Sequence, residues 1–325
     1  MFMRPSVAPT PSTADLERKQ FADDVAYYLR LDPRQLPSRY FYDPLGSALF
    51  EAICHLPWYS ITRAERRLLE AHASDIMRRL PQVSTLVELG PGSGEKLSML
   101  VAARPTASLT VHLVDVSSAA LDLAMRTVGV HDQVTVVPHQ ASYEAGLETL
   151  SRILTGRTLV LFLGSNIGNF DRPGADEFLR TIRRALAPGD ALLIGADLVK
   201  ANRDLVLAYD DPLGVTAAFN RNLLVRVNRE LGADFDLDAF THRAIWNPIE
   251  SRVEMHLVSV RSQRVHIAAS RLDLTLDAGE TIWTESSYKY RAAEIIAMLA
   301  RAGFRAIERW VDEGDGFALT LVEAA

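Results

Sequence analysis

A glycine-rich turn in the segment VELGPGSGEKL, residues 87–97, is the first pattern in this chain that could do chemistry. Its glycines allow a tight turn and let a ligand approach the backbone closely: Gly90, Gly92 and Gly94. A helical pattern follows the turn. Asp115 ends the next apolar run, where an acid can accept hydrogen bonds from a ribose diol. The order strand, turn, helix, strand and acid predicts a nucleotide-containing cofactor.

The spacing of the glycines separates two classes of cofactor. Dinucleotide-binding proteins carry G-x-G-x-x-G, whereas this chain carries G-x-G-x-G with Glu88 two residues before the first glycine. This spacing resembles motif I of class I methyltransferases, and we therefore expect S-adenosylmethionine as the cofactor. A nicotinamide-dependent oxidoreductase stays as the alternative.

The segment TIWTESSYKY, residues 281–290, is the second such pattern. Its composition predicts a short strand, and because side chains alternate along a strand, Glu285 and Ser287 are expected on one face. A carboxylate beside a hydroxyl can bind a ligand that offers both a donor and an acceptor. A solvated face of the sheet is the simpler explanation when the pair is taken alone.

The elements that must position these residues follow a regular rhythm. Apolar runs of strand length are predicted at 84–90, 109–115, 134–140, 158–164 and 191–197. Helical patterns separate them at 95–103, 118–128, 144–154 and 174–186. A final helix at 292–303 and strands at 306–312 and 317–324 close the chain. The alternation predicts an α/β fold with a mostly parallel seven-stranded sheet and a terminal antiparallel hairpin. This plan resembles the Rossmann-like fold of class I methyltransferases.

The alternation of strands and helices stops after Asp197, which indicates an insertion. A helix is predicted at 212–231, followed by an antiparallel sheet with strands at 240–246, 252–260, 264–269 and 281–287. We expect the insertion to pack with the N-terminal helices as a second, smaller α+β domain. The predicted division is a disordered lead-in over 1–15, a methyltransferase domain over 62–198 and 288–325, and a substrate-binding domain over 16–61 and 199–287.

Composition excludes several classes of partner. A net charge of -6 over 325 residues gives no electrostatic footprint for nucleic acid or an anionic membrane. The charged segment at 62–70 is interpreted as a solvated helix face, and the eight histidines are too scattered for a metal site. The single Cys54 fits a reducing compartment, which predicts a cytoplasmic protein. A monomer is the working expectation.

Five segments together resemble the histidine-specific Nα-methyltransferases of ergothioneine biosynthesis, over nearly all of the chain after residue 35. They lie at 39–65, 163–170, 208–224, 252–257 and 284–290. The resemblance implies transfer of three methyl groups from S-adenosylmethionine to the α-amino nitrogen of L-histidine, giving hercynine. It also implies a second domain that completes the amino-acid site. Another amino acid such as tryptophan is the alternative substrate, and a cofactor-binding protein without activity is a further alternative.

The resemblance implies a role for each matching residue. Asn169 and Tyr209 would bind the substrate carboxylate, whereas Glu285 and Ser287 would meet the imidazole, with the acid favouring a protonated or strongly polarised ring. Tyr42 and Phe50 would lie near the reacting amine. The remaining substrate-binding residues by resemblance are Tyr59, Gly164 and Met255.

The cofactor residues follow in the same way, with one departure. By motif and resemblance they are Glu88, Gly90, Gly92, Gly94, Lys96, Asp115, Ser142 and Tyr143. Where the family usually places an aspartate before an aromatic residue for adenine, this chain has Ser142 and Tyr143. A hydroxyl still accepts a hydrogen bond but carries no charge, so weaker binding of the cofactor is expected.

Overall fold

The computed structural model describes residues 13–104 and 108–325, which form two compact units. Unit 1 consists of Met1–Phe50, Asp210–Ala244 and Glu254–Glu285, and unit 2 of Glu51–Tyr209, Ile245–Val253 and Ser286–Ala325. Most of the predicted lead-in, residues 1–12, lies outside the described residues. The predicted domain boundaries stay a prediction. None of the described helices is long and apolar enough to cross a membrane.

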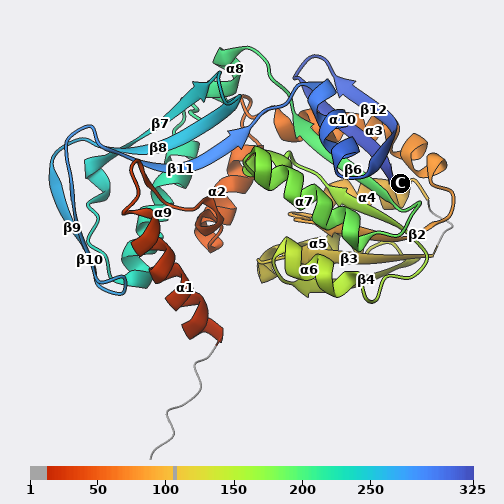
Figure 1. Cartoon of the computed structure of the whole chain (residues 1–325), viewed down its shortest axis with the longest axis horizontal. Coiled ribbons are helices and arrows are strands. Elements are labelled where there is room, and N and C mark those ends of the chain that lie inside the picture. The colour runs from red at the N-terminus through yellow and green to blue at the C-terminus, as the bar shows by residue number, and fades with distance from the viewer. Residues whose placement is uncertain (1–12, 105–107) are drawn as a thin grey trace, which may run out of the picture. The chain divides into compact units, whose positions relative to one another are not determined.

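Unit 2 is built on a seven-stranded sheet with strand order β12-β13-β6-β5-β2-β3-β4 (Figure 1). Its strands are β2 Val83–Leu89, β3 Leu109–Asp115, β4 Val134–Gln140, β5 Arg157–Phe162, β6 Ala191–Asp197, β12 Phe304–Asp312 and β13 Phe317–Ala324. β13 runs antiparallel to both of its neighbours, and the other neighbouring strands pair in parallel. The predicted α/β class with a mostly parallel seven-stranded sheet is confirmed.

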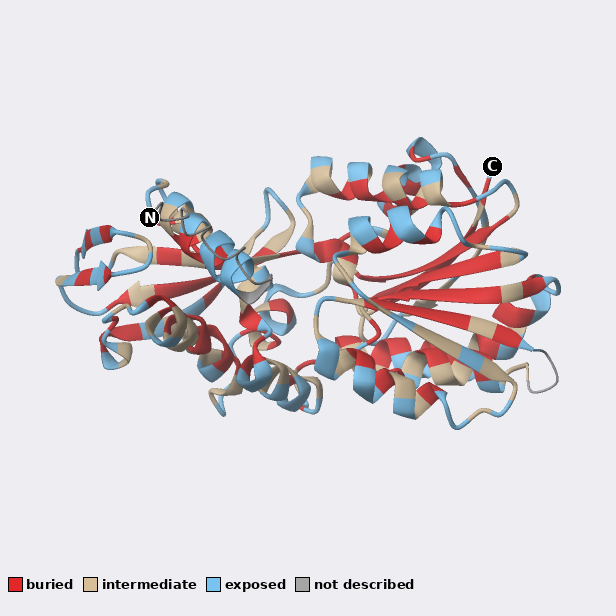
Figure 2. Ribbon diagram, turned by 90° about the horizontal axis from the view of Figure 1, so that it is seen from below, coloured by how far each residue is buried: buried red, intermediate tan, exposed pale blue. Residues whose placement is uncertain are grey.

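Helices cover both faces of this sheet (Figure 2). One group of neighbouring helices comprises α3 Ile61–Arg79, α4 Glu95–Ala102 and α5 Ser118–Val128. The other comprises α6 Tyr143–Leu150, α7 Arg172–Ala185 and α10 Ala292–Arg301, which pack with sheet residues into one buried cluster. The short α8, Asn202–Leu207, follows β6. Burial on both faces explains why β5 and β6 are apolar along most of their length.

Capping side chains fix where two of these helices begin. The Ser117 hydroxyl accepts a hydrogen bond from the backbone nitrogen of Ala120 at 3.3 Å, at the start of α5. The Asp171 carboxylate accepts one from Gly174 at 2.8 Å, at the start of α7. Each cap ends a loop that leaves the carboxyl end of a parallel strand. Since ligands of open α/β sheets bind at that edge, the caps also fix the walls of a binding site.

The charged segment at 62–70 is only partly the solvated helix face that was predicted. Arg66 and Arg67 are exposed, but Glu65 is fully buried. The prediction is wrong for Glu65 because neighbouring residues of a helix point in different directions. Glu65 faces the sheet so closely that a Cβ added to Gly195 would lie 2.1 Å from its Oε1.

Unit 1 combines helices with a four-stranded sheet of order β1-β11-β8-β7. Its helical elements are α1 Thr13–Tyr28, η1 Ser38–Phe41, α2 Pro44–Cys54, α9 Val215–Leu231 and η3 Leu237–Ala239. The strands of the sheet are β1 Arg34–Gln35, β7 Phe240–Asn247, β8 Arg252–Ser259 and β11 Thr281–Tyr288. Three of these elements, α2, β7 and β11, begin in unit 1 and end in unit 2, while β8 does the reverse.

The predicted antiparallel sheet of the insertion needs two corrections. The segment at 264–269 does not join it: β9, Gln263–Ile267, pairs instead with β10, Leu272–Leu276, in a separate two-stranded sheet. In addition, β1 pairs in parallel with β11, so the four-stranded sheet is not entirely antiparallel. Neither β1 nor β10 was predicted: both are short, and β1 pairs with a strand far along the chain, whereas β10 forms a local hairpin with β9.

Replacing Gly46 with alanine tests the packing at the start of α2. A Cβ there would lie 1.7 Å from the backbone oxygen of Phe41, which cannot move without disturbing η1. We expect Gly46→Ala to lower the free energy of unfolding by about 1–3 kcal/mol, as overpacking does. Urea unfolding followed by circular dichroism measures it, with Ser47→Ala on the same helix as the control. Equal unfolding midpoints for the two variants would contradict this packing.

Candidate active site

The glycine turn joins β2 to α4 in unit 2. Gly90, Gly92 and Gly94 have φ angles of 75°, 54° and 76°, a region that favours glycine. A Cβ on Gly94 would lie 2.9 Å from the Cα of Ala124, so this glycine lets α4 approach α5. A Cβ on Gly92 would meet no described atom within 4 Å. The turn is therefore open at Gly92, where a ligand can reach the backbone.

Two carboxyl groups flank the turn. Glu88 is 1% exposed, and its Oε2 has no hydrogen-bond partner among the described residues. Burial raises the pKa of Glu88 to about 8, against the opposing charge of Lys96. Asp115, at the end of β3, accepts a hydrogen bond from the backbone nitrogen of Ser117 at 2.8 Å, and burial raises its pKa as well. A buried oxygen without a partner is unfavourable, and a donor on a nucleoside cofactor would satisfy it.

Ser142 and Tyr143 begin α6 at the expected adenine position. The Ser142 hydroxyl is the N-cap of the helix and accepts a hydrogen bond from the backbone nitrogen of Ala145 at 3.3 Å. Tyr143 packs edge-on against Phe162, with ring centroids 5.6 Å apart, and burial raises its pKa. A Cβ on Gly90 would lie 2.6 Å from the Tyr143 hydroxyl, so the structure brings this tyrosine to the glycine turn.

Lys96 binds a carboxylate that the sequence did not single out. Its Nζ lies 2.6 Å from Oε2 of the buried Glu65. The backbone nitrogen of Gly164 donates to both oxygens of Glu65, at 2.8 and 2.9 Å. These additional hydrogen bonds help a buried ion pair to offset its lost hydration. Glu65 therefore connects α3, α4 and the loop after β5. The sequence did not indicate this role, because Glu65 stands among other charged residues in the segment at 62–70.

The loop after β5 carries Asn169 at the end of the short helix η2, Asn166–Asn169. The end of β11 holds this loop in place. A Cβ on Gly168 would lie 2.7 Å from the backbone oxygen of Tyr288, and the Tyr290 hydroxyl donates to the backbone oxygen of Ile167 at 3.1 Å. The loop therefore presents an exposed Asn169 side chain on a fixed backbone.

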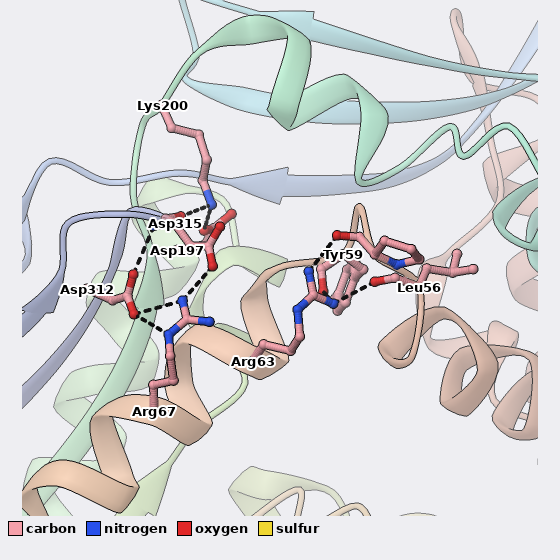
Figure 3. Close-up of polar contacts among 9 residues, drawn as sticks. Leu56, Tyr59, Arg63, Arg67, Asp197, Lys200, Asp312 and Asp315 are labelled. Carbon is pink, nitrogen blue, oxygen red and sulfur yellow. Dashed lines mark hydrogen bonds and ion pairs between the residues drawn. The ribbon is translucent and has the colours of Figure 1, made fainter.

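Arg63 fixes the turn that carries Tyr59, before α3 (Figure 3). Its guanidinium donates to the backbone oxygens of Leu56 at 2.6 Å, Pro57 at 2.5 Å and Tyr59 at 3.2 Å. The Tyr59 ring is buried and packs edge-on against Tyr209, with centroids 6.2 Å apart. The structure thus brings these two predicted substrate residues together within unit 2.

Tyr209 and Ser287 also meet, although they are distant in the sequence. The Tyr209 hydroxyl donates to Ser287 Oγ at 2.8 Å, and both side chains are buried. The predicted carboxylate-binding residue therefore contacts a predicted imidazole-binding residue directly. Lys289, which the sequence analysis missed, contacts both hydroxyls. Its spacing of two from Ser287 was the available signal, since positions two apart share a strand face.

In unit 1, Tyr42 and Phe50 belong to an aromatic cluster that includes Phe219 of α9. The ring centroids are 5.6 Å apart for Tyr42 and Phe50, 5.9 Å for Tyr42 and Phe219, and 6.0 Å for Phe50 and Phe219. Tyr42 is 39% exposed. Aromatic rings attract ammonium groups, so this cluster has the chemistry that an amine-binding role requires.

Asp43 holds the segment that carries Tyr42. Its carboxylate accepts hydrogen bonds from the backbone nitrogen of Gly46 at 2.7 Å, from Asn222 at 2.7 Å and from Arg229 at 2.8 Å. Burial acts to raise the pKa of Asp43, but these three donors outweigh it and lower the pKa. The ionised carboxylate therefore ties η1 and α2 to α9.

Met255 and Glu285 lie on the neighbouring strands β8 and β11. Met255 is buried, and its backbone oxygen accepts a hydrogen bond from the Thr284 hydroxyl at 3.0 Å. Glu285 is half-buried, and its backbone oxygen accepts one from Trp283 Nε1 at 2.7 Å. These bonds fix the strand backbone from which the Glu285 side chain projects.

Replacing Gly92 with alanine tests whether the turn binds the cofactor. The added methyl enters the open space beside the turn, and the positive φ adds strain of about 1 kcal/mol. We expect Gly92→Ala to weaken binding of S-adenosylhomocysteine at least about tenfold, measured by calorimetry, because a clash with a ligand adds to this strain. Gly214→Ala is the matched control, since Gly214 has a φ of 75° and similar open space in unit 1. Equal affinities for both variants would contradict a cofactor at this turn.

Comparisons with known proteins agree with this geometry. The model of a family described as "Histidine-specific methyltransferase, SAM-dependent" matches residues 21–324. The chain is 43% identical to histidine N-alpha-methyltransferase of Mycolicibacterium smegmatis, over 95% of this chain and 96% of that protein. It is also 43% identical to histidine N-alpha-methyltransferase of Mycobacterium tuberculosis, over 92% of this chain and 93% of the relative. Ergothioneine biosynthesis protein 1 of Neurospora crassa is 27% identical, over 89% of this chain and 33% of that protein. This chain belongs to the family of histidine-specific, S-adenosylmethionine-dependent methyltransferases.

Proposed function

We propose that this protein transfers three methyl groups from S-adenosylmethionine to the α-amino nitrogen of L-histidine, giving hercynine for ergothioneine biosynthesis. The observation that carries the proposal is the match to two histidine N-alpha-methyltransferases over nearly the whole of each chain. Membership of a methyltransferase family argues against a nicotinamide-dependent oxidoreductase. The glycine spacing at 90–94 argues the same way.

The proposed cofactor residues surround the glycine turn of unit 2. They are Glu88, Gly90, Gly92, Gly94, Lys96, Asp115, Ser142 and Tyr143. The open backbone at Gly92 and the unsatisfied Oε2 of Glu88 support this assignment. When bound, S-adenosylmethionine supplies an electrophilic methyl group. The protein's own task is then to hold the amine in line and to exclude water.

For the amino-acid end of the substrate, we propose that Asn169 and Tyr209 bind the carboxylate. An amide and a phenol can donate to a carboxylate without forming a buried ion pair, which would require costly desolvation. The fixed loop that presents Asn169 supports its role. Gly164, at the start of that loop, and Tyr59, which packs on Tyr209, are proposed to complete this part of the site.

For the imidazole, we propose Glu285, Ser287 and Met255. A carboxylate accepts a hydrogen bond from one ring N–H, a hydroxyl adjusts to the other ring nitrogen, and a thioether packs against the ring. An amino acid without the ring would offer Glu285 no N–H of this kind, and would therefore bind more weakly. An indole satisfies this set poorly, which favours histidine over tryptophan.

At the amine end, Tyr42 and Phe50 are proposed to face the nitrogen as it gains methyl groups. Cation–π attraction of about 0.5–2 kcal/mol per ring suits a product with a permanent positive charge. A free α-amine has a pKa of about 8, so a fraction of the substrate molecules carries a neutral amine in the cell. The neutral amine can attack without a dedicated base. We propose that solvent removes the released protons. The free Cys54 supports a cytoplasmic location, and a monomer remains the proposed state.

A panel of amino acids tests the substrate directly. With purified protein and S-adenosylmethionine, we expect mono-, di- and trimethylated products from L-histidine only. Mass spectrometry detects these products. The reason is that histidine alone offers an imidazole to both Glu285 and Ser287. Methylation of tryptophan in place of histidine would show that the proposed substrate is wrong. Binding of S-adenosylhomocysteine without methylation of any amino acid would refute the proposal that the protein is an enzyme.

Replacing Glu285 with alanine tests recognition of the ring. Loss of a hydrogen bond that involves a charged group is expected to lower kcat/KM for histidine about 10- to 100-fold. Affinity for S-adenosylhomocysteine is expected to stay the same. Glu313→Ala removes an exposed carboxylate and serves as the control. An equal loss in both variants, or lost cofactor affinity in Glu285→Ala, would contradict the assigned role.

A further inference from the structure

Lys96 stands in the first turn of α4, two residues after Gly94 of the glycine turn. A cation at this end of a helix is unfavourable, because the helix dipole is positive there. The Lys96 side chain is 27% exposed, and its Nζ has one hydrogen-bond acceptor among the described residues, Oε2 of Glu65 at 2.6 Å. An ammonium group has three protons. Two protons of Lys96 therefore remain available to a ligand.

The Glu65 carboxylate is fixed from two sides. Its two oxygens share the backbone N–H of Gly164, at 2.8 and 2.9 Å, and its side chain is fully buried. On the other side, a Cβ on Gly195 would lie 2.1 Å from Oε1, so β6 makes room for the carboxylate by carrying a glycine in its interior. Burial acts to lower the pKa of Lys96, but Glu65 outweighs it and raises the pKa. The ammonium group is therefore both charged and held.

The place of this ammonium group indicates which ligand it meets. A Cβ on Gly164 would lie 3.3 Å from Lys96 Nζ, so the group lies against the backbone of the loop after β5. The strands β2 and β5 are neighbours, and loops at the carboxyl ends of parallel strands form the ligand-binding edge of such a sheet. The one anionic group of S-adenosylmethionine is its carboxylate. It is the part of the cofactor that an ammonium group attracts.

Resting on the proposed function, we infer that Glu65 is a positioning residue, which holds the Lys96 ammonium beside Gly164 so that its two free protons can donate to the carboxylate of the bound cofactor. Glu65 touches no ligand itself, because its side chain has no exposed surface. Its effect on the cofactor therefore passes through Lys96. Histidine also carries a carboxylate, and binding measurements separate the two ligands.

Calorimetry with two nucleosides tests the inference. S-adenosylhomocysteine carries the carboxylate, whereas 5′-methylthioadenosine has the same nucleoside and a thioether but no amino-acid part. We expect Glu65→Gln to weaken S-adenosylhomocysteine about 10- to 100-fold, as the loss of a charge-assisted hydrogen bond does, and 5′-methylthioadenosine less than about threefold. Equal losses for both ligands would mean that Glu65 only shapes the fold. A loss confined to histidine binding would place Lys96 at the substrate carboxylate. Either result would overturn the inference.

Glu95→Gln is the matched control. Glu95 pairs with Arg66, so this exposed pair also joins α4 to α3, but its removal takes away none of the contacts of Lys96. We expect the control to change the affinity for S-adenosylhomocysteine less than about twofold, because exposed ion pairs contribute little. If Glu95→Gln and Glu65→Gln weaken this ligand equally, the inference is wrong.

A double-mutant cycle asks whether Glu65 acts through Lys96. In a Lys96→Met background, Glu65→Gln should weaken S-adenosylhomocysteine no further, since no ammonium group remains to be positioned. The double variant also leaves no buried charge without a partner, so a loss of stability is not the cause of its weak binding. Additive losses in this cycle would contradict the assigned role.

A crystal structure of the unmodified protein with S-adenosylhomocysteine gives an answer that needs no variant. We expect Lys96 Nζ within hydrogen-bonding distance of both Glu65 and the carboxylate of the ligand. A ligand carboxylate away from Lys96 would overturn the inference even if every variant failed to fold. If the parent binds this ligand but methylates no histidine, the proposed function fails, and the affinities still decide the role of Glu65. If the parent methylates histidine and Glu65→Gln binds the ligand as Glu95→Gln does, only this inference fails.

Discussion

The ammonium of Lys289 and the carboxylate of Asp197 lie in the interior of unit 2, where water reaches neither. A buried charge is tolerated only when it is paired and its remaining hydrogen-bonding groups are satisfied. The pair Lys96 and Glu65 obeys the same constraint, with Gly164 as the additional donor. Both pairs tie strands and helices to the loops at the carboxyl edge of the sheet. The candidate site thus depends on electrostatic neutrality as well as on apolar packing.

The two classes of ligand make different demands on unit 2. The cofactor is proposed to meet a backbone turn, whose shape comes from glycines and from the helices packed behind it. The amino acid is proposed to meet side chains, whose direction must be fixed one by one. Arg63 does this for Tyr59, and the contacts of Lys289 do it for Tyr209 and Ser287. This division explains why the glycine turn could be predicted from the sequence, whereas the supporting residues Arg63 and Lys289 could not.

The parallel sheet could be predicted because its strands are continuous apolar runs between helical segments, as in β5 and β6. The glycine turn followed from spacing alone. By contrast, Glu65 and Lys289 look like surface charges in a single sequence, because the partners that neutralise them lie far along the chain. β1 was missed for a similar reason, since this two-residue strand pairs with β11, which lies far along the chain. Long-range contacts separate what was predicted from what was not.

The N-cap role of Ser142 has an evolutionary consequence. Serine and aspartate stabilise a helix N-terminus about equally well, so α6 would begin at the same residue with either side chain. The helix therefore does not constrain which of the two occupies this position. A lineage can add or remove one negative charge near the glycine turn through a single codon change, without refolding the surrounding loop. The proposed contact of this position with the cofactor can therefore change without a loss of helix stability.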